Sequence, residues 1–147
     1  MSEAEASCNE CYVYFAFRGD DFNPDDITKE LGISPTSVMI KGSRIPGKVP
    51  RANAWRLSTE TVKDNTTDID FIDVYEMALE VVNQLKSSVD IINQIKQKYN
   101  AVTVLEVVMW ISVNDELSTP AVGFELDVLD FLVQTRTTID MDIYRNE

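Results

Sequence analysis

The sequence predicts an α+β domain of two layers, in which helices pack on one face of a mainly antiparallel sheet. Short runs that alternate apolar and polar residues indicate strands, and longer regions with apolar residues at three- and four-residue spacing indicate amphipathic helices. The two kinds of segment follow one another as β-α-β-β-α-β and then β-α-β. We therefore expect a ferredoxin-like core followed by a C-terminal β-α-β addition.

The first half of the chain supplies three of the expected strands. Residues 11–18 alternate aromatic and β-branched residues, which is typical of a strand. A short helix then begins after Asn23 and ends at Gly32, because Asn is a good N-cap and Gly accepts the left-handed C-terminal position. Residues 37–41 and 54–58 are expected to be strands, separated by a loop rich in Gly and Pro.

The second half begins with the longest helical region, in which Phe71, Tyr75 and Leu85 belong to the expected buried face. Ser87 and Ser88 interrupt this region, and a second helix follows. Later segments are expected to be a central strand at 101–113, a short strand at 121–125, a helix capped by Asp127 and a last strand at 138–144. Both tryptophans, Trp55 and Trp110, lie on expected strands and are expected to be largely buried.

Length and composition indicate one folded unit. A chain of 147 residues with 44% hydrophobic residues can bury a core without disulfide bonds or a structural metal ion. We expect residues 1–10 to form a flexible N-terminal tail and residues 11–147 a single domain. An acidic N-terminus without an apolar stretch, and the absence of any run of apolar residues long enough to cross a bilayer, predict a cytoplasmic protein that has no membrane partner.

Charge and composition narrow the possible functions. The chain has 25 acidic and 13 basic residues, a net charge of −12, and no histidine. An acidic field repels phosphate backbones, so we expect no nucleic-acid partner. Without histidine, the common general base and the Ser-His-Asp system are absent, and we expect no enzyme activity and no cofactor.

Two carboxylates near the C-terminus form a first candidate site. Asp140 and Asp142 alternate with Ile139, Met141 and Ile143 in the last strand, so both should project from the same, outward face. They are candidates for binding a basic partner. Paired carboxylates also serve glycoside hydrolysis or divalent-metal binding, and a solvated edge of the sheet is the plainer interpretation.

A basic segment forms a second candidate site. It carries no acidic residue between Glu30 and Glu60, and its Gly and Pro residues predict a loop. Its cationic side chains would bind a phosphate or carboxylate ligand. The alternative is a loop whose charge offsets the acidic remainder, because no glycine pattern that cradles phosphate is present. The candidate residues are Lys41, Arg44, Lys48, Arg51 and Arg56.

The two cysteines, Cys8 and Cys11, have the spacing of a redox pair or a zinc half-site. They precede a strand instead of a helix N-terminus, and the chain offers no further Cys or His as a zinc ligand. We therefore expect no metal here and expect that replacing both by Ser leaves stability unchanged.

Three motifs resemble a bacterial family of domains of unknown function, the one numbered 4279. They are the helix end at residues 27–36, the Lys41-Gly42-Ser43 step and the strand Ala54–Ser58 that carries Trp55. The last strand is similar to the closing strand of that family. The resemblance covers about Tyr12 to Tyr144, implies the α+β fold and implies no activity.

Taken together, these features favour a non-enzymatic protein-binding module of the immunity or adaptor type. Its expected partner is a basic, toxin-like protein or a second copy of the chain. The alternatives that remain open are a small anionic-ligand-binding domain that uses the basic segment and, third, a hydrolase that depends on Asp140 and Asp142.

Overall fold

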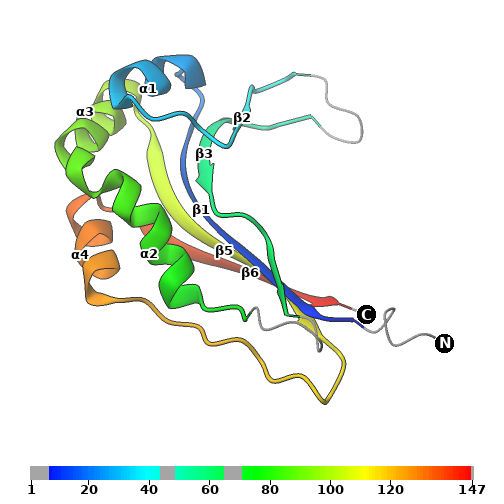
Figure 1. The fold of residues 1–147 in the computed structure, drawn as a ribbon. Coiled ribbons are helices and arrows are strands. Elements are labelled where there is room, and N and C mark those ends of the chain that lie inside the picture. Colours follow the sequence, from blue (N-terminus) through cyan, green and yellow to red (C-terminus); the bar gives the residue numbers. More distant parts are fainter. Residues whose placement is uncertain (1–6, 44–48, 65–70, 147) are drawn as a thin grey trace.

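A computed structural model describes residues 7–43, 49–64 and 71–146 of the chain. The fold is α+β: a six-stranded, mostly antiparallel open sheet carries helices on one of its faces (Figure 1). The predicted fold class is therefore confirmed. The expectation of a ferredoxin-like core within this arrangement stays a prediction.

The central strand of the sheet is β1 (Asn9–Gly19). It pairs antiparallel with β3 (Asn53–Ser58) on one side and with β5 (Val102–Ser112) on the other. Both long strands are rich in aromatic and β-branched residues, which pack well on a pleated surface. The strand order β2-β3-β1-β5-β6 places β2 (Ser37–Met39) and β6 (Thr138–Asn146) at the two edges.

The last strand, β6, pairs parallel with β5, with Glu106 opposite Asp140 in register. A parallel neighbour needs a crossover connection, and helix α4 (Leu126–Gln134) provides it. Asn146 ties this end of the sheet to the start of the chain, since its Nδ2 donates to the Cys8 carbonyl at 2.7 Å and to Glu10 Oε2 at 2.9 Å.

The sequence explains where α1 (Pro24–Leu31) begins and ends. The Asn23 side chain accepts a hydrogen bond from the Asp25 amide at 3.0 Å, as an N-cap does. Gly32 adopts φ 73°, a left-handed conformation that a residue without Cβ enters at little cost. The predicted N-cap and C-cap are both confirmed.

The longest helical region consists of α2 (Val74–Leu85), the 3₁₀ turn η2 (Lys86–Ser88) and α3 (Val89–Tyr99). The predicted interruption at Ser87 and Ser88 is thus a single turn of tighter helix. These helices and α4 bury their apolar faces against β1, β3 and β5, and Figure 1 shows them on the same side of the sheet. None of the described helices is long and apolar enough to cross a membrane.

The main core lies between the sheet and the helices. Its largest side chains include Trp55, Phe15 and Phe17, which are fully buried and contact one another edge to face. The Trp55 indole also donates from Nε1 to Thr28 Oγ1 at 3.0 Å, which satisfies its polar group inside the core. Burial of Trp55 is as the sequence predicted.

The structure differs from the sequence-based expectation at the N-terminus. Strand β1 begins at Asn9, inside the segment expected to be a tail, and Asn9 is 1% exposed. Its side chain is held by hydrogen bonds with Asp64, Ser118 and Ser112. Aromatic alternation begins only at residue 11, so the polar residues at the start of the strand gave no signal. Residues 1–6 lie outside the described residues.

Three further expectations were wrong. Two residues of the expected buried face are exposed: Phe71, at 80%, precedes α2, which begins only at Val74, and Tyr75 in the first turn is 38% exposed. Residues 121–125 form no strand, and Ala121 makes only an isolated bridge with Asp73. Asp127 lies in the first turn of α4, whose N-cap position is Glu125. A short strand that the sequence missed, β4 (Val62–Asp64), pairs with the start of β1.

Candidate functional site

The candidate site lies on the face of the sheet that the described helices leave uncovered, which we call the open face. Because side chains alternate along a strand, the even-numbered residues of β1, β5 and β6 project there. A small apolar cluster of Tyr14, Ala16, Val104 and Val108 forms its floor, with Tyr12 and Trp110 packed against it. This cluster consists of strand residues alone, so the burial on this face comes from neighbouring side chains.

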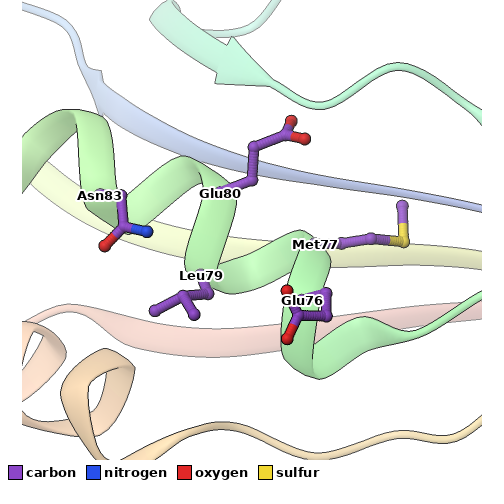
Figure 2. Close-up of a pocket in the computed structure, with 5 residues that line it drawn as sticks. All are labelled: Glu76, Met77, Leu79, Glu80 and Asn83. Atoms are coloured by element: carbon purple, nitrogen blue, oxygen red, sulfur yellow. The ribbon is translucent and has the colours of Figure 1, made fainter.

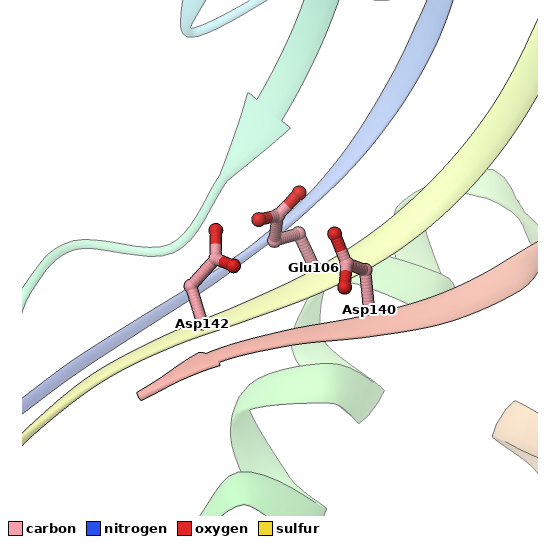
Figure 3. Close-up of side chains that lie close together, drawn as sticks. All are labelled: Glu106, Asp140 and Asp142. Atoms are coloured by element: carbon pink, nitrogen blue, oxygen red, sulfur yellow. The ribbon is translucent and has the colours of Figure 1, made fainter. Parts of the chain in front are cut away.

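Three carboxylates meet on the open face, and we call them the acidic trio: Glu106 from β5 and Asp140 and Asp142 from β6. One carboxylate oxygen of each lies within 4.8 Å of the others. Figure 3 shows the three side chains projecting from the two strands on the same side of the sheet. The predicted shared face of Asp140 and Asp142 is thus present in the structure.

Glu106 is the buried member of the trio, with 3% of the residue exposed. Its Oε1 accepts hydrogen bonds from Tyr14 Oη at 3.0 Å and from Arg18 Nη2 at 2.9 Å. Burial raises the pKa of the Glu106 carboxyl above its usual value, and the neighbouring Asp142 carboxylate raises it further, whereas Arg18 and Tyr14 oppose the shift.

A row of aromatic rings runs across the open face beside the trio, and we call it the aromatic row. Tyr144 stacks on Trp110 with ring centroids 5.5 Å apart, and Trp110 lies 6.0 Å from Tyr12. Tyr12 in turn stacks on Tyr14 at 6.1 Å. Trp110 is therefore only partly buried, contrary to the expectation that both tryptophans lie in the core.

Arg56 closes the row at its β3 end. Its guanidinium lies 4.6 Å from the centroid of the Tyr14 ring, which is a cation–π contact. The Arg56 Nε atom is buried and has no hydrogen-bond partner among the described residues. Burial raises the pKa of the Tyr14 hydroxyl to about 12, so Tyr14 is neutral near pH 7 and donates to Glu106.

The remaining residues of the basic segment lie elsewhere. Lys41 is exposed and forms an ion pair with Asp20 at 3.3 Å, and Arg51 is exposed before β3. Arg44 and Lys48 lie outside the described residues. Among the members that the structure describes, Arg56 is the one on the open face, so the segment supplies one residue to the candidate site.

Sequence reasoning missed Glu106, Tyr14 and Arg18 as site residues. Glu106 lies in a strand that is apolar on both faces, and an acidic residue in such a strand indicates a hydrogen-bonding partner on one face. Arg18 lies four residues after Tyr14 on β1, a spacing that puts both side chains on the same face. Their meeting with Glu106 depends on the β1–β5 register, Tyr14 opposite Glu106, which no local pattern reveals.

The cysteines do not form a common site. Cys11 is fully buried in the main core, and burial raises the pKa of its thiol to about 12. The pKa of Cys8 is also raised, first by burial, so both thiols are protonated near neutral pH. Burial of Cys11 argues against the expectation that a double Ser substitution leaves stability unchanged, since Ser there places a hydroxyl in the core.

A hollow along α2 is the second surface feature. It is lined by Glu76, Met77, Leu79, Glu80 and Asn83. Figure 2 shows these side chains spreading from the helix in different directions, with Glu80 pointing away from Glu76. Their polar groups do not converge on one point, so this hollow is a weaker candidate for a binding site than the open face.

The acidic trio can bind an amine or guanidinium group, share a proton, or hold a divalent cation through Glu106, Asp140 and Asp142. One oxygen of Glu106 is already engaged by Arg18, a fixed positive charge that opposes a second cation at that atom. Asp140 is exposed and Asp142 is half-buried, so these two carboxylates are the ones a ligand would reach first.

Comparison with known protein families gives a match over most of the chain. A family model described as "Domain of unknown function (DUF4279)" matches residues 9–146, nearly the whole chain. Searches of curated proteins and of solved structures returned no match.

Proposed function

The chain belongs to the DUF4279 family, and from this premise and its own open face we propose that it is a non-catalytic binding module for a basic protein. The open face receives a lysine or arginine side chain of that partner. Such a module fits the role of an immunity protein against a cationic, toxin-like protein, or of an adaptor that binds one.

One observation carries the proposal: the acidic trio converges beside the aromatic row. Carboxylates bind an ammonium or guanidinium group by charge-assisted hydrogen bonds, and aromatic faces attract the same cation. Asp140 and Asp142 remain accessible, and Asp142 is followed on the same face of β6 by Tyr144, which stacks on Trp110, whereas Glu106 is held by Tyr14 and Arg18. The site therefore offers a cation both charge and a flat apolar contact.

Net charge supports the same partner class. A net charge of −12 attracts a basic protein from a distance and raises its association rate. The carboxylates of the trio then provide the short-range contact at the end of this approach.

A basic peptide tests the proposal. We expect association of an acetylated tetralysine amide to slow steeply with added salt, because the field reaches only about 10 Å at 0.1 M. Stopped-flow measures it through the change in tryptophan emission, to which Trp110 on the open face contributes. Asp140→Asn/Asp142→Asn should reduce the association rate by about threefold to tenfold, as loss of local steering does.

The matched control is Asp21→Asn/Glu80→Gln, which removes the same charge at exposed positions away from the open face. We expect it to change the association rate by less than about twofold, since screening confines the steering field to the neighbourhood of its charges. Equal effects of the two double variants would show that only net charge matters, and the proposal would then be wrong.

A second candidate is an anionic-ligand site, which the buried and unpaired Nε of Arg56 favours. A carboxylate or phosphate that reached this atom would also lie near Arg18. Binding of inorganic phosphate that Arg56→Gln abolishes, together with no response to tetralysine, would favour this candidate.

The third candidate, a carboxylate-dependent hydrolase, is favoured by the raised pKa of Glu106 beside Asp142. A carboxyl group whose pKa is raised by burial next to a second carboxyl group is the arrangement of a general acid and its partner. Turnover of a chromogenic glycoside that Glu106→Gln removes would favour it over the binding module.

A further inference from the structure

The outer edge of β6 presents an unpaired backbone. Within residues 7–43, 49–64 and 71–146, β6 pairs only with β5, so the N–H and C=O groups on its other side have no strand partner. A strand with a free edge can accept another extended chain through main-chain hydrogen bonds.

The two faces of this strand differ in chemistry. Asp140 and Asp142 project onto the open face, where they join Glu106. On the other face Ile139, Met141 and Ile143 are 38%, 36% and 59% exposed. Edge strands are usually protected by charges or bulges, so a row of partly exposed apolar side chains along an edge indicates a surface that another chain covers.

A groove continues the apolar side of β6 toward α4. It is lined by Leu129, Leu132, Val133, Arg136, Thr137 and Ile139. Val133 is 77% exposed there. A second groove at the other end of β6 includes Ile111, Val113 and Ile143. Apolar side chains of an added strand would lie over these two grooves.

Charge decides between the two kinds of occupant. A second copy that pairs antiparallel with β6 at full overlap is centred on Asp142, so the two Asp142 carboxylates face each other across the edge. Each copy also carries −12. A basic segment meets the same edge with opposite charge, so the complementarity favours a different, cationic chain.

We propose that the partner binds as an extended segment along β6, with basic and apolar residues in alternation. Its basic residues face the acidic trio, and its apolar residues cover Ile139, Met141 and Ile143 and the groove beside α4. This inference rests on the proposed function. It adds the binding mode, which is strand addition, and a partner sequence in which basic and apolar residues alternate.

The test uses an acetylated, amidated peptide in which lysine and valine alternate. Its first control has the same composition, with the lysines and valines in separate blocks. Two further controls carry backbone N-methyl groups, either on every lysine or on every valine. In a strand the N–H groups of alternate residues point to opposite sides, so for a given strand direction with the lysines over the acidic trio only one of these two peptides can pair with β6.

We expect calorimetry to show that the alternating peptide binds more tightly than the block peptide. One N-methylated form should lose about tenfold or more in affinity, as the loss of one or two main-chain hydrogen bonds implies, and the other should not. Hydrogen exchange should slow at alternate amides of residues 138–146, which electrostatic contact alone does not produce.

Variants on the apolar side complete the test. Val133→Ser/Ile143→Thr should weaken the alternating peptide severalfold, whereas Val122→Thr, at an exposed position in the loop before α4, should leave its affinity unchanged. Light scattering of the protein alone tests whether a second copy of the chain occupies the edge of β6 instead. A stable dimer through β6 would overturn the inference.

The inference and the proposed function can fail separately. If all peptides bind alike and lose affinity in Asp140→Asn/Asp142→Asn, the open face binds cations but strand addition is wrong. If N-methylation matters and the two Asp→Asn changes do not, strand addition holds and the cationic partner is wrong.

Discussion

The two faces of β1 are buried in different ways. On the helix-covered face, Phe15 and Phe17 lie in a layered core and contact rings from helix and strand neighbours. On the open face, Tyr14 and Ala16 are as fully buried, yet only neighbouring strand side chains cover them. Burial without a second layer desolvates polar groups and leaves them within reach of a ligand. The raised pKa of Glu106 is one result.

The largest test of this contrast compares the two tryptophans. Trp55→Ala should lower the free energy of unfolding by about 3–5 kcal/mol, because it empties a filled core and removes the donor to Thr28. Trp110→Ala should cost less, since its ring is partly exposed and stacks on Tyr144. Urea denaturation of both variants measures the difference, and equal losses would contradict the distinction between the faces.

A smaller effect is expected at the cysteines. Cys11→Ser should lower the free energy of unfolding by about 1–3 kcal/mol, because it buries a hydroxyl in the main core. Cys8→Ser is the matched control and should change it by less than about 0.5 kcal/mol, as substitutions away from the core do. Thermal unfolding of the two single variants checks this, and a neutral Cys11→Ser would show that the core is loosely packed there.

The finest test is the pH dependence of Glu106→Gln. A raised pKa in the folded state means that folding favours the protonated carboxyl, so the wild-type protein loses stability as pH rises from 4.5 through the raised pKa. Gln resembles the protonated form and does not titrate. The melting temperature of the variant relative to wild type should therefore rise across this window. A relative decrease would mean that Arg18 lowers the pKa overall.

Local patterns predicted most of the fold. Aromatic alternation indicated β1 and its apolar face, and the spacing of Asn23 and Gly32 located both ends of α1. Family resemblance agreed with the family match over residues 9–146. Elements with weak local signals were missed: β4 is three residues long and polar, and Asn9 joins β1 through contacts with distant residues.

The candidate site was half predictable. Alternation placed Asp140 and Asp142 on the same side of β6, because that relation is local. The third carboxylate comes from Glu106, and only the β5–β6 register places it opposite Asp140. Arg56 was selected for its charge within the basic segment, whereas its position follows from the pairing of β3 with β1, Arg56 opposite Ala16.

Placing the first strand at the centre of the sheet has a kinetic consequence. Phe15 pairs with Leu105, and Asn146 bonds to Cys8, so the contacts that complete the sheet join residues far apart in the chain. Folding rates fall as the sequence separation of native contacts increases, and folding times on the order of milliseconds to seconds are typical of such topologies. During synthesis β1 can pair with β3 first and gains its second long neighbour only when β5 has emerged. Its apolar face stays uncovered until the helices have emerged as well.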